Sequence, residues 1–524
     1  MSAAARAIRV RLDRAIDAFT FDRLLAALLF LAIALAAALM PAQNDTFWQM
    51  RAGREMWASG RVLLRDTFSH TVYGARWPNH EWLSQAVLYA LYAIGGLPIV
   101  TLACAALVML AWWIVWRETP AAPRVKFLLT APVVVAACGV WSPRPQIFSL
   151  LLIAVTMRLL RARRYKWLPL VFLVWANMHG AVVMGAWMLV AALLASLVES
   201  PRSSRRLFAA CAASALATCL TPLGLRFWID VVESLQRIRA MRIAEWAPPQ
   251  PGDPALIAFW LALALLVVLA ALRGRALWHD AEACERGHLT LCALALALAP
   301  LAVSAVRNVP PFLMLAVPAI GALLPPLPQL ARRREQARPA LNAAITAVAA
   351  TIAIATVASA YVLRIGHLGW APLPAASIAK LNECRGNVYN RYDEGGYLIW
   401  FAPERKVFLD GRQDPYPPSL IAEQVQAEAT GDVDALLRRY DVSCAFMPSK
   451  SLVTARLVDE GWATLYRDAR WAVLERTDRG VDLSYGARPY LCVLCDQSPI
   501  PNPRSYTSRK TTSGSTRPAA RAGR

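Results

Sequence analysis

The stretch "LLAALLFLAIALAAALM", Leu24 to Met40, holds no charged residue, and "PAQNDTFWQMRAG" follows it with an acid, two aromatic residues and an arginine. A run of this length predicts a membrane-spanning helix, because a span needs about 20 apolar residues. The run is also longer than the about 7–15 residues of a signal-peptide core. We therefore predict that Leu24–Met40 stays in the membrane and that Asp45 stands at its exit.

The composition extends this reading to most of the chain. Of 524 residues, 57% are hydrophobic and only 17% are charged, which is typical of a polytopic membrane protein. We predict an α-helical membrane protein with about 11 transmembrane helices and a small C-terminal α/β domain. The predicted spans are 24–40, 97–116, 127–141, 146–160, 167–178, 181–198, 207–222, 255–272, 289–305, 309–325 and 341–363.

The positive charge follows the predicted topology. The net charge of +21 comes from Lys and Arg in the tail and in clusters between the spans, so we predict no nucleic-acid partner. With the basic segment 1–23 in the cytoplasm, the basic connections "RETPAAPRVK", "RARRYK" and "ESPRSSRR" are cytoplasmic too, as the positive-inside rule requires. This predicts that the C-terminal domain lies on the outer side of the membrane. Reading 167–198 as one long helix would instead turn that domain inward.

Two soluble parts complete the predicted organisation. Segment 41–96 forms a large outer loop with two helices lying flat in the membrane interface, at Phe47–Ser59 and Glu81–Ile94. The domain at 364–480 has predicted strands at "VYN", "YLIW", "KVFLD", "VSCAFM", "WATLYRD" and "WAVLER", and helices at "SLIAEQVQAEATGDVDALLRRY" and "SLVTARLVDEG". Segment 481–524 is rich in Pro, Ser, Thr and Arg, which predicts a disordered basic tail.

Four cysteines fall in this outer domain or in its tail: Cys384, Cys444, Cys492 and Cys495. A disulfide is compatible with an oxidising compartment, and the sequence leaves its pairing open.

The predicted topology brings unusual polar residues to one side of the membrane. They are Asp45, Asp66, His80, Glu81, Arg144, His179, Glu245 and Arg307. Carboxylates there can act as bases or orient a hydroxyl group, while arginines and a histidine can hold a phosphate. The segment 167–178 rises only about 18 Å, so His179 is expected at membrane depth, where a polar side chain normally faces a cavity or a partner. These residues predict group transfer from a lipid-borne, phosphate-linked donor.

At this point the sequence resembles the membrane-embedded C-class glycosyltransferases over roughly residues 20–330. That class includes protein O-mannosyltransferases, the lipid A aminoarabinose transferase and lipopolysaccharide-core transferases. The likeness rests on an acid after the first span, an outer loop of two interfacial helices, a second acid and later basic residues. More particularly, the chain looks like a group of uncharacterised bacterial membrane proteins of that class. This likeness rests on "DTFWQMRAGREMWASGRVLLRDTFSHTVYGARWPNHEWLSQ", "WANMHG", "TPLGL", "EW", "RNVPPF" and "GGYLIW…VFLDGR". The resemblance to them implies a protein of the bacterial inner membrane.

The resemblance implies a reaction and roles for single residues. A sugar would pass from a polyprenyl-phosphate donor in the membrane lipid to a periplasmic or lipid-linked acceptor, which is a glycan, a lipid or a protein, with inversion. Asp45 would be the base, and Glu81 would be the second acid. Members of the class more often have this acid followed by prolines and a leucine, whereas this sequence has "HEW", so His80 would share the role of Glu81. The remaining roles are donor-phosphate binding by Arg144, His179 and Arg307, and acceptor contact by Asp66 and Arg412.

No cofactor is expected. The acid pair with one intervening residue that oligosaccharyltransferases have is absent, because "NDT" holds one acid only, and this argues against a bound divalent metal.

Simpler roles remain open for several of these residues. Asp45, Asp66 and Glu81 are each in a position to cap a helix or a turn, and Arg144 could only snorkel to lipid phosphates. For the whole protein, the alternatives are a transporter or flippase for a lipid-linked sugar and a non-catalytic scaffold for envelope glycan assembly. The sequence leaves the sugar, the acceptor and the lipid length open.

Overall fold

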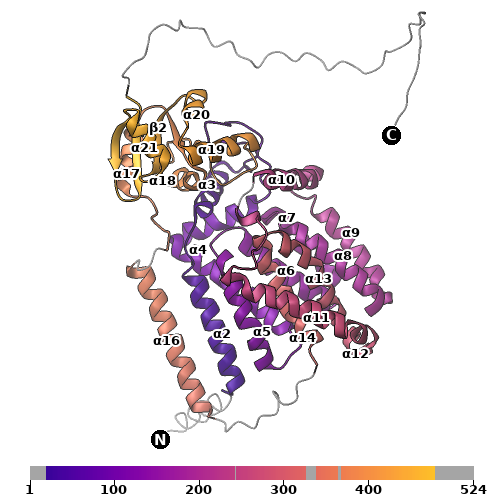
Figure 1. The fold of residues 1–524 in the computed structure, drawn as a ribbon. Helices are drawn as coiled ribbons and strands as arrows, with labels where there is room; N and C mark the ends of the chain where they lie inside the picture. The colour runs from indigo at the N-terminus through magenta and orange to yellow at the C-terminus, as the bar shows by residue number, and fades with distance from the viewer. Residues whose placement is uncertain (1–18, 242–243, 326–337, 364–367, 478–524) are drawn as a thin grey trace, which may run out of the picture. The chain divides into compact units, whose positions relative to one another are not determined.

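The computed structural model describes residues 19–241, 244–325, 338–363 and 368–477 (Figure 1). The predicted cytoplasmic N-terminus up to residue 18, the predicted tail 481–524, Cys492 and Cys495 lie outside these residues.

Helices form at all of the predicted spans. Their bounds are α2 Phe21–Ala38, α4 Trp82–Glu118, α5 Pro123–Ala137, α6 Gln146–Arg161, α7 Leu168–Met178, α8 Val182–Glu199, α9 Pro201–Ala217, α11 Ile257–His279, α13 His288–Ser304, α14 Val309–Leu323 and α16 Pro339–Leu363. Seven segments of the described chain are long and apolar enough to cross a membrane: Phe21–Ala38, Trp82–Glu118, Pro123–Val140, Val182–Glu199, Pro254–His279, Val306–Leu323 and Pro339–Leu363. The polytopic helical architecture is therefore confirmed, although four of the eleven helices (α6, α7, α9 and α13) are shorter than a full span. With 11 residues, α7 rises only about 16 Å.

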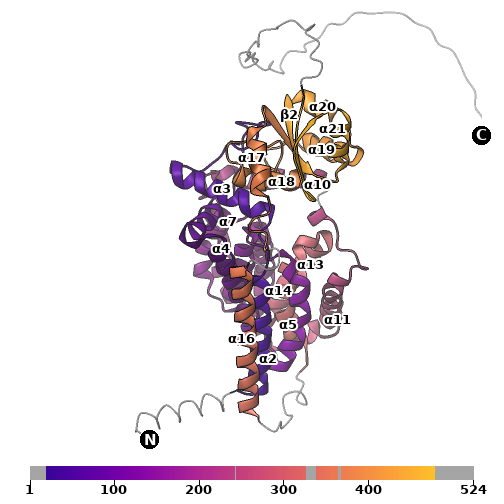
Figure 2. The same ribbon diagram turned by 90° about the vertical axis from the view of Figure 1, so that its left-hand side faces the viewer.

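The helices pack in a way that separates a core from a periphery. All but one residue of α14 are buried, and α14 contacts α13, α11, α5 and α4. By contrast, α16 buries little of its surface and runs beside α2 in both views (Figures 1 and 2).

The other helices of the membrane part and its loops connect the spans. They are α3 Asn44–Ser59, α10 Phe227–Met241 and α12 Ala281–Glu285, with the 3-10 turns η1 Cys138–Val140, η2 Tyr165–Trp167, η3 Gly224–Arg226, η4 Ala244–Trp246, η5 Pro254–Leu256 and η6 Val306–Asn308.

The first outer segment contains the two predicted helices, with one difference. The first is α3, and the second is not separate, because it continues into the following span as the N-terminal part of α4. Gly95 and Gly96 break the helical geometry between the two parts, and Gly96 has a φ of +69°, which glycine adopts without a Cβ penalty. The kink therefore lies where the sequence predicts the end of the interfacial helix.

The C-terminal domain has a four-stranded mixed sheet in the order β1-β2-β4-β3. Strand β1 pairs in parallel with β2, and β4 pairs antiparallel with both β2 and β3. The elements are α17 Ala375–Glu383, β1 Asn387–Asn390, α18 Tyr392–Phe401, α19 Pro418–Thr430, α20 Asp434–Arg439, β2 Val442–Pro448, α21 Leu452–Asp459, β3 Ala463–Arg467 and β4 Trp471–Glu475. The predicted small α/β domain is confirmed.

Two of its predicted strands are wrong. "YLIW" lies in helix α18, and "KVFLD" forms only an isolated bridge between Val407 and Ser69. The glycines that suggested a turn instead let α18 approach its neighbours. A Cβ on Gly395 would overlap the Leu409 carbonyl, and one on Gly396 would overlap Asn44 of α3. Close packing against the Leu409 backbone and against α3 thus outweighs the cost of about 1 kcal/mol that each glycine adds to a helix.

A disulfide joins Cys384, directly after α17, to Cys444 in β2. It answers the pairing question within the described part of the chain, since Cys492 and Cys495 are outside it. Disulfides persist in oxidising compartments, which accords with the predicted outer location of this domain.

Candidate active site

Asp45 lies in the first turn of α3, and its carboxylate is not used for capping. The cap is made by Thr46, whose hydroxyl accepts a hydrogen bond from the Gln43 amide at 3.2 Å. Asp45 Oδ1 accepts from the Trp48 indole at 3.0 Å, and Oδ2 lies 2.8 Å from Nη1 of Arg144. The side chain of Asp45 keeps 27% of its surface exposed, so part of this carboxylate remains accessible.

Arg144 extends the site toward the segment 244–246. Its Nη1 also lies 3.3 Å from Glu245 Oε1, while its buried Nε has no hydrogen-bond partner among the residues that the structure describes. Arg307 stacks on the ring of the neighbouring Trp246, with 4.4 Å from Cζ to the ring centroid. The two arginines predicted to bind phosphate therefore both lie against the η4 turn.

A second cluster forms around Glu81, which precedes α4. Its side chain makes no capping hydrogen bond within the described chain, so capping does not account for it. Glu81 Oε2 accepts from the amide of Gln49, and Oε1 lies 3.5 Å from Nε2 of His179 and 3.9 Å from Nε2 of His80. Burial raises the pKa of the Glu81 carboxyl. Because Gln49 stands one turn after Asp45 on α3, that helix connects the two clusters.

His179 is buried, and the Ser149 hydroxyl contacts the ring nitrogen that faces away from Glu81. Its Nδ1 lies 2.8 Å from the Ser149 hydroxyl, and the same hydroxyl accepts a hydrogen bond from the Trp175 indole at 2.8 Å. Since Ser149 already accepts one hydrogen bond, its proton is available for Nδ1, which favours the tautomer with its proton on Nε2. That proton then points toward Glu81. His179 lies directly after the short helix α7 and before α8, as the sequence predicts.

The C-terminal domain contributes a third carboxylate, Asp414, to this cluster. Its Oδ2 lies 3.8 Å from Nδ1 of His80, and its Oδ1 accepts a hydrogen bond from Ser234 of α10 at 2.7 Å. Burial raises the pKa of the Asp414 carboxyl, while His80 and Arg237 oppose that shift. The imidazole of His80 thus lies between two carboxylates that come from different parts of the chain.

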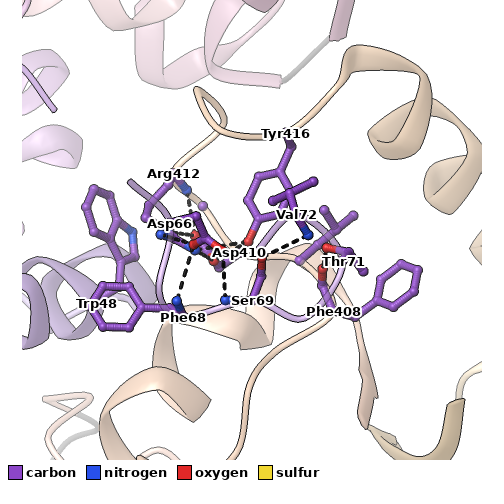
Figure 3. Close-up of polar contacts among 12 residues, drawn as sticks. Trp48, Asp66, Phe68, Ser69, Thr71, Val72, Phe408, Asp410, Arg412 and Tyr416 are labelled. Atoms are coloured by element: carbon purple, nitrogen blue, oxygen red, sulfur yellow. Dashed lines mark hydrogen bonds and ion pairs between the residues drawn. The ribbon is translucent and has the colours of Figure 1, made fainter. Parts of the chain in front are cut away.

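Asp66 and Arg412, the two predicted acceptor contacts, form a separate buried network (Figure 3). The Arg412 guanidinium lies 2.5 Å from Asp66 and 2.6 Å from Asp410, and none of these side chains has exposed surface. Asp66 also accepts from Ser69, and Tyr416 bonds to both Asp410 and Arg412. Their polar groups are used inside the protein, so the structure gives both residues a structural role.

Asp45, Glu81, His80, Arg144, His179 and Arg307 all fall in these neighbouring clusters. Sequence reasoning missed Asp414, and also Gln49, Trp48 and Ser149, which hold the charged groups in place. "LDGRQD" gave the one available signal, an acid-rich turn, but it pointed to Arg412 rather than to Asp414. Chemically, the site offers carboxylates that can accept a proton next to guanidinium groups that can bind an anion.

Neither a family model nor a curated protein matches the chain. Among solved structures, its fold is similar to that of the archaeal oligosaccharyltransferase AglB from Archaeoglobus fulgidus, in complex with an inhibitory peptide and a dolichol-phosphate. The TM-score is 0.54 at 12% sequence identity, over 81% of this chain and 69% of that one. This confirms, at the level of the fold, the predicted C-class glycosyltransferase architecture.

Proposed function

We propose that this protein is a glycosyltransferase that moves a sugar from a polyprenyl-phosphate donor to an acceptor on the periplasmic side of the bacterial inner membrane. The observation that best supports this is the contact between Asp45 and Arg144, at 2.8 Å. It joins a partly exposed carboxylate, suited to an acceptor hydroxyl, to a guanidinium suited to a phosphate. The likeness to an oligosaccharyltransferase fold agrees with this chemistry.

The proposed reaction is a single displacement at the anomeric carbon. The acceptor oxygen attacks that carbon as its proton passes to Asp45, the bond from the carbon to the phosphate oxygen breaks, and polyprenyl phosphate leaves. Such a displacement inverts the anomeric centre. Arg144 and Arg307 would stabilise the charge that develops on the phosphate. The buried Nε of Arg144, which has no partner within the described ranges, is a donor suited to this role.

The second cluster is proposed to serve the acceptor. Glu81 faces two imidazole groups, so it has neighbours that can share a proton or orient a hydroxyl. His179, predicted from the sequence to bind the donor phosphate, is proposed instead to orient Glu81 through its Nε2–H, because Nδ1 is hydrogen-bonded to Ser149.

Three observations support an outer location for the site and for the C-terminal domain. The disulfide needs an oxidising compartment. Helices α4 and α6 begin near the site, at Trp82 and Gln146, and end far from it at arginine-rich turns. There a cavity of about 360 Å³ is lined by Arg117, Glu118, Arg158, Arg161, Ala162 and Arg286. The positive-inside rule assigns that end to the cytoplasm.

The test is donor consumption in purified membranes that contain labelled polyprenyl-phosphate sugars. We expect the wild-type protein to release polyprenyl phosphate and Asp45→Asn to lower that rate by about 10²–10⁴-fold, since the proton acceptor is lost. Asp459→Asn, at an exposed position of α21, is the matched control and should keep the wild-type rate.

A wild-type protein that binds or moves the donor without cleaving it would instead be a transporter or a scaffold. Full activity in a well-folded Asp45→Asn variant would rule out Asp45 as the base.

A further inference from the structure

One loop of the C-terminal domain, "DGRQD" at residues 410–414, enters the proposed active site. At one end, a Cβ on Gly411 would overlap Asp45 Oδ1 and lie 3.3 Å from the Trp48 indole nitrogen. At the other end, the Asp414 carboxylate lies 3.8 Å from His80. Between them, Arg412 is fixed by its buried ion pairs with Asp66 and Asp410. The loop is therefore anchored in its middle and contacts both clusters at its ends.

We propose that Asp414 is a positioning residue for transfer, which holds His80 so that the opposite ring nitrogen faces Glu81. This inference rests on the proposed function and makes the C-terminal domain part of the active site. Nδ1 of the ring lies 3.2 Å from the Pro78 carbonyl and 3.8 Å from the Asp414 carboxylate, while Nε2 faces Glu81 at 3.9 Å. When the ring is protonated, a carboxylate on each side attracts the imidazolium and holds it in this orientation, and the held ring orients Glu81.

Asp414 is itself held in place, as a positioning residue must be. Ser234 donates to its carboxylate at 2.7 Å, and Arg237, from the same helix α10, donates to its main-chain carbonyl at 2.9 Å. The side chain of Asp414 is 10% exposed, so a charged group is kept out of water at a cost.

The backbone before Asp414 provides an independent observation. Gln413 has a φ of +60°, in the left-handed region that residues other than glycine seldom adopt. Its side chain is tied to the Tyr392 hydroxyl at 2.8 Å, which helps to hold that conformation. Strained backbone of this kind persists where the surroundings fix it, and it is common at functional sites. This turn directly precedes Asp414, whose carboxylate lies 3.8 Å from His80.

The test is a double-mutant cycle on donor consumption in full-length protein. Asp414→Asn keeps an oxygen acceptor for Ser234 and removes the charge, so we expect a similar thermal midpoint and a kcat lowered by about 10-fold, with the donor KM unchanged. His80→Gln should lower kcat by a similar factor. Because both variants break one relationship, the double variant should lose no more than the worse single variant. Asp414→Glu should restore part of the rate.

A cross-linking experiment measures the contact between the 410–414 loop and α10 independently of activity. Ser234→Cys combined with Asp414→Cys should be joined by a short bifunctional maleimide, whereas Ser234→Cys combined with Asp459→Cys should not. The role of Asp414 would be overturned if the kcat losses of the two single variants multiplied in the double variant, or if Asp414→Asn kept the wild-type kcat. In either case, donor consumption by the wild-type protein would still support the proposed function. A cross-linked loop in a wild-type protein that consumes no donor would overturn the proposed function, and this inference with it.

Discussion

The guanidinium of Arg412, in the C-terminal domain, lies 2.5 Å from the carboxylate of Asp66, in the segment between the first span and α4. The cation also stacks on Phe68 and Trp77, at 5.0 Å from each ring centroid. Two parts of the chain separated by more than 300 residues are thus joined by a charge pair that has no contact with water. Removing Arg412 would leave the buried carboxylates of Asp66 and Asp410 without this cation.

We therefore expect Arg412→Met to destabilise the C-terminal domain by about 3–5 kcal/mol, the usual cost of breaking a buried ion pair. The measurement is the thermal midpoint in detergent, together with the rate at which trypsin cleaves the C-terminal domain. Arg438→Met is the control, because the Arg438 side chain is 70% exposed and its loss should change stability by less than about 0.5 kcal/mol. Equal midpoints for the two variants would contradict the role given to Arg412.

The membrane part of the fold follows from sequence because its signal is local. Every predicted span holds a helix, since an apolar run in lipid must satisfy its own backbone hydrogen bonds. The errors in the C-terminal domain have a tertiary origin. "YLIW" is β-prone by composition, yet it is helical because Gly395 and Gly396 allow α18 to pack against its neighbours. Local propensity does not report such packing.

The residues of the candidate site likewise include some that the sequence could predict and some that it could not. Topology alone brought Asp45, Arg144 and His179 to one side, and the structure then joins them to their partners. Asp414 was not predictable, because its approach to His80 depends on how a distant domain contacts the bundle. Asp66 showed a turn signal, and it does accept from the Phe68 and Ser69 amides, but its ion pair with Arg412 has no signature in the sequence.

Arg144 is expected to act on the donor. Arg144→Gln removes a charge-assisted contact to phosphate, so kcat/KM for the donor should fall by about 10²-fold. Arg144→Lys, which keeps the charge and loses the planar fork, should recover only part of it. Steady-state kinetics with the lipid-linked sugar check this, and Arg54→Gln, at an exposed position of α3, is the control. If Arg144→Gln affected only acceptor kinetics, the assignment to the donor would be wrong.

Metal independence is a separate expectation. The Arg144 guanidinium lies 2.8 Å from the Asp45 carboxylate and so already places a positive charge beside it. We propose that this arginine supplies the positive charge, so that transfer needs no divalent ion. Dialysis against EDTA should leave donor consumption within about two-fold of its starting rate, whereas a metal-dependent site would lose orders of magnitude. Recovery on adding Mg²⁺ or Mn²⁺ after such a loss would refute the proposal.

The disulfide between Cys384 and Cys444 gives a test of topology and stability together. It closes a loop with a sequence separation of 60, which the chain-entropy model values at about 4 kcal/mol. Cys384→Ser combined with Cys444→Ala should lower the stability of the C-terminal domain by up to that amount. In protein extracted under denaturing, non-reducing conditions, both cysteines should resist alkylation until a reductant is added, while Cys219 is alkylated at once. Alkylation of Cys384 without reductant would argue against an oxidising location.

Glu428 makes the stability of the C-terminal domain depend on pH. Burial raises its pKa to about 6 from 4.5, even though the Tyr389 hydroxyl donates to its carboxylate at 2.8 Å. A carboxyl whose pKa is higher in the folded state favours folding while it is protonated. This contribution is complete below pH 4.5 and is lost as the pH rises through 6.

The shift corresponds to at most about 2 kcal/mol, and partial exposure of the group reduces that value. Glu428→Gln mimics the protonated form and keeps an acceptor for Tyr389, so the variant should be more stable than the wild type at pH 7.5 and equally stable at pH 4.5. Thermal midpoints at the two pH values measure the effect, with the exposed Glu404→Gln as a control that should follow the wild type at both. A Glu428→Gln variant less stable than the wild type at pH 7.5 would mean that the ionised carboxylate stabilises the fold, because the Tyr389 hydrogen bond would then outweigh the cost of burial.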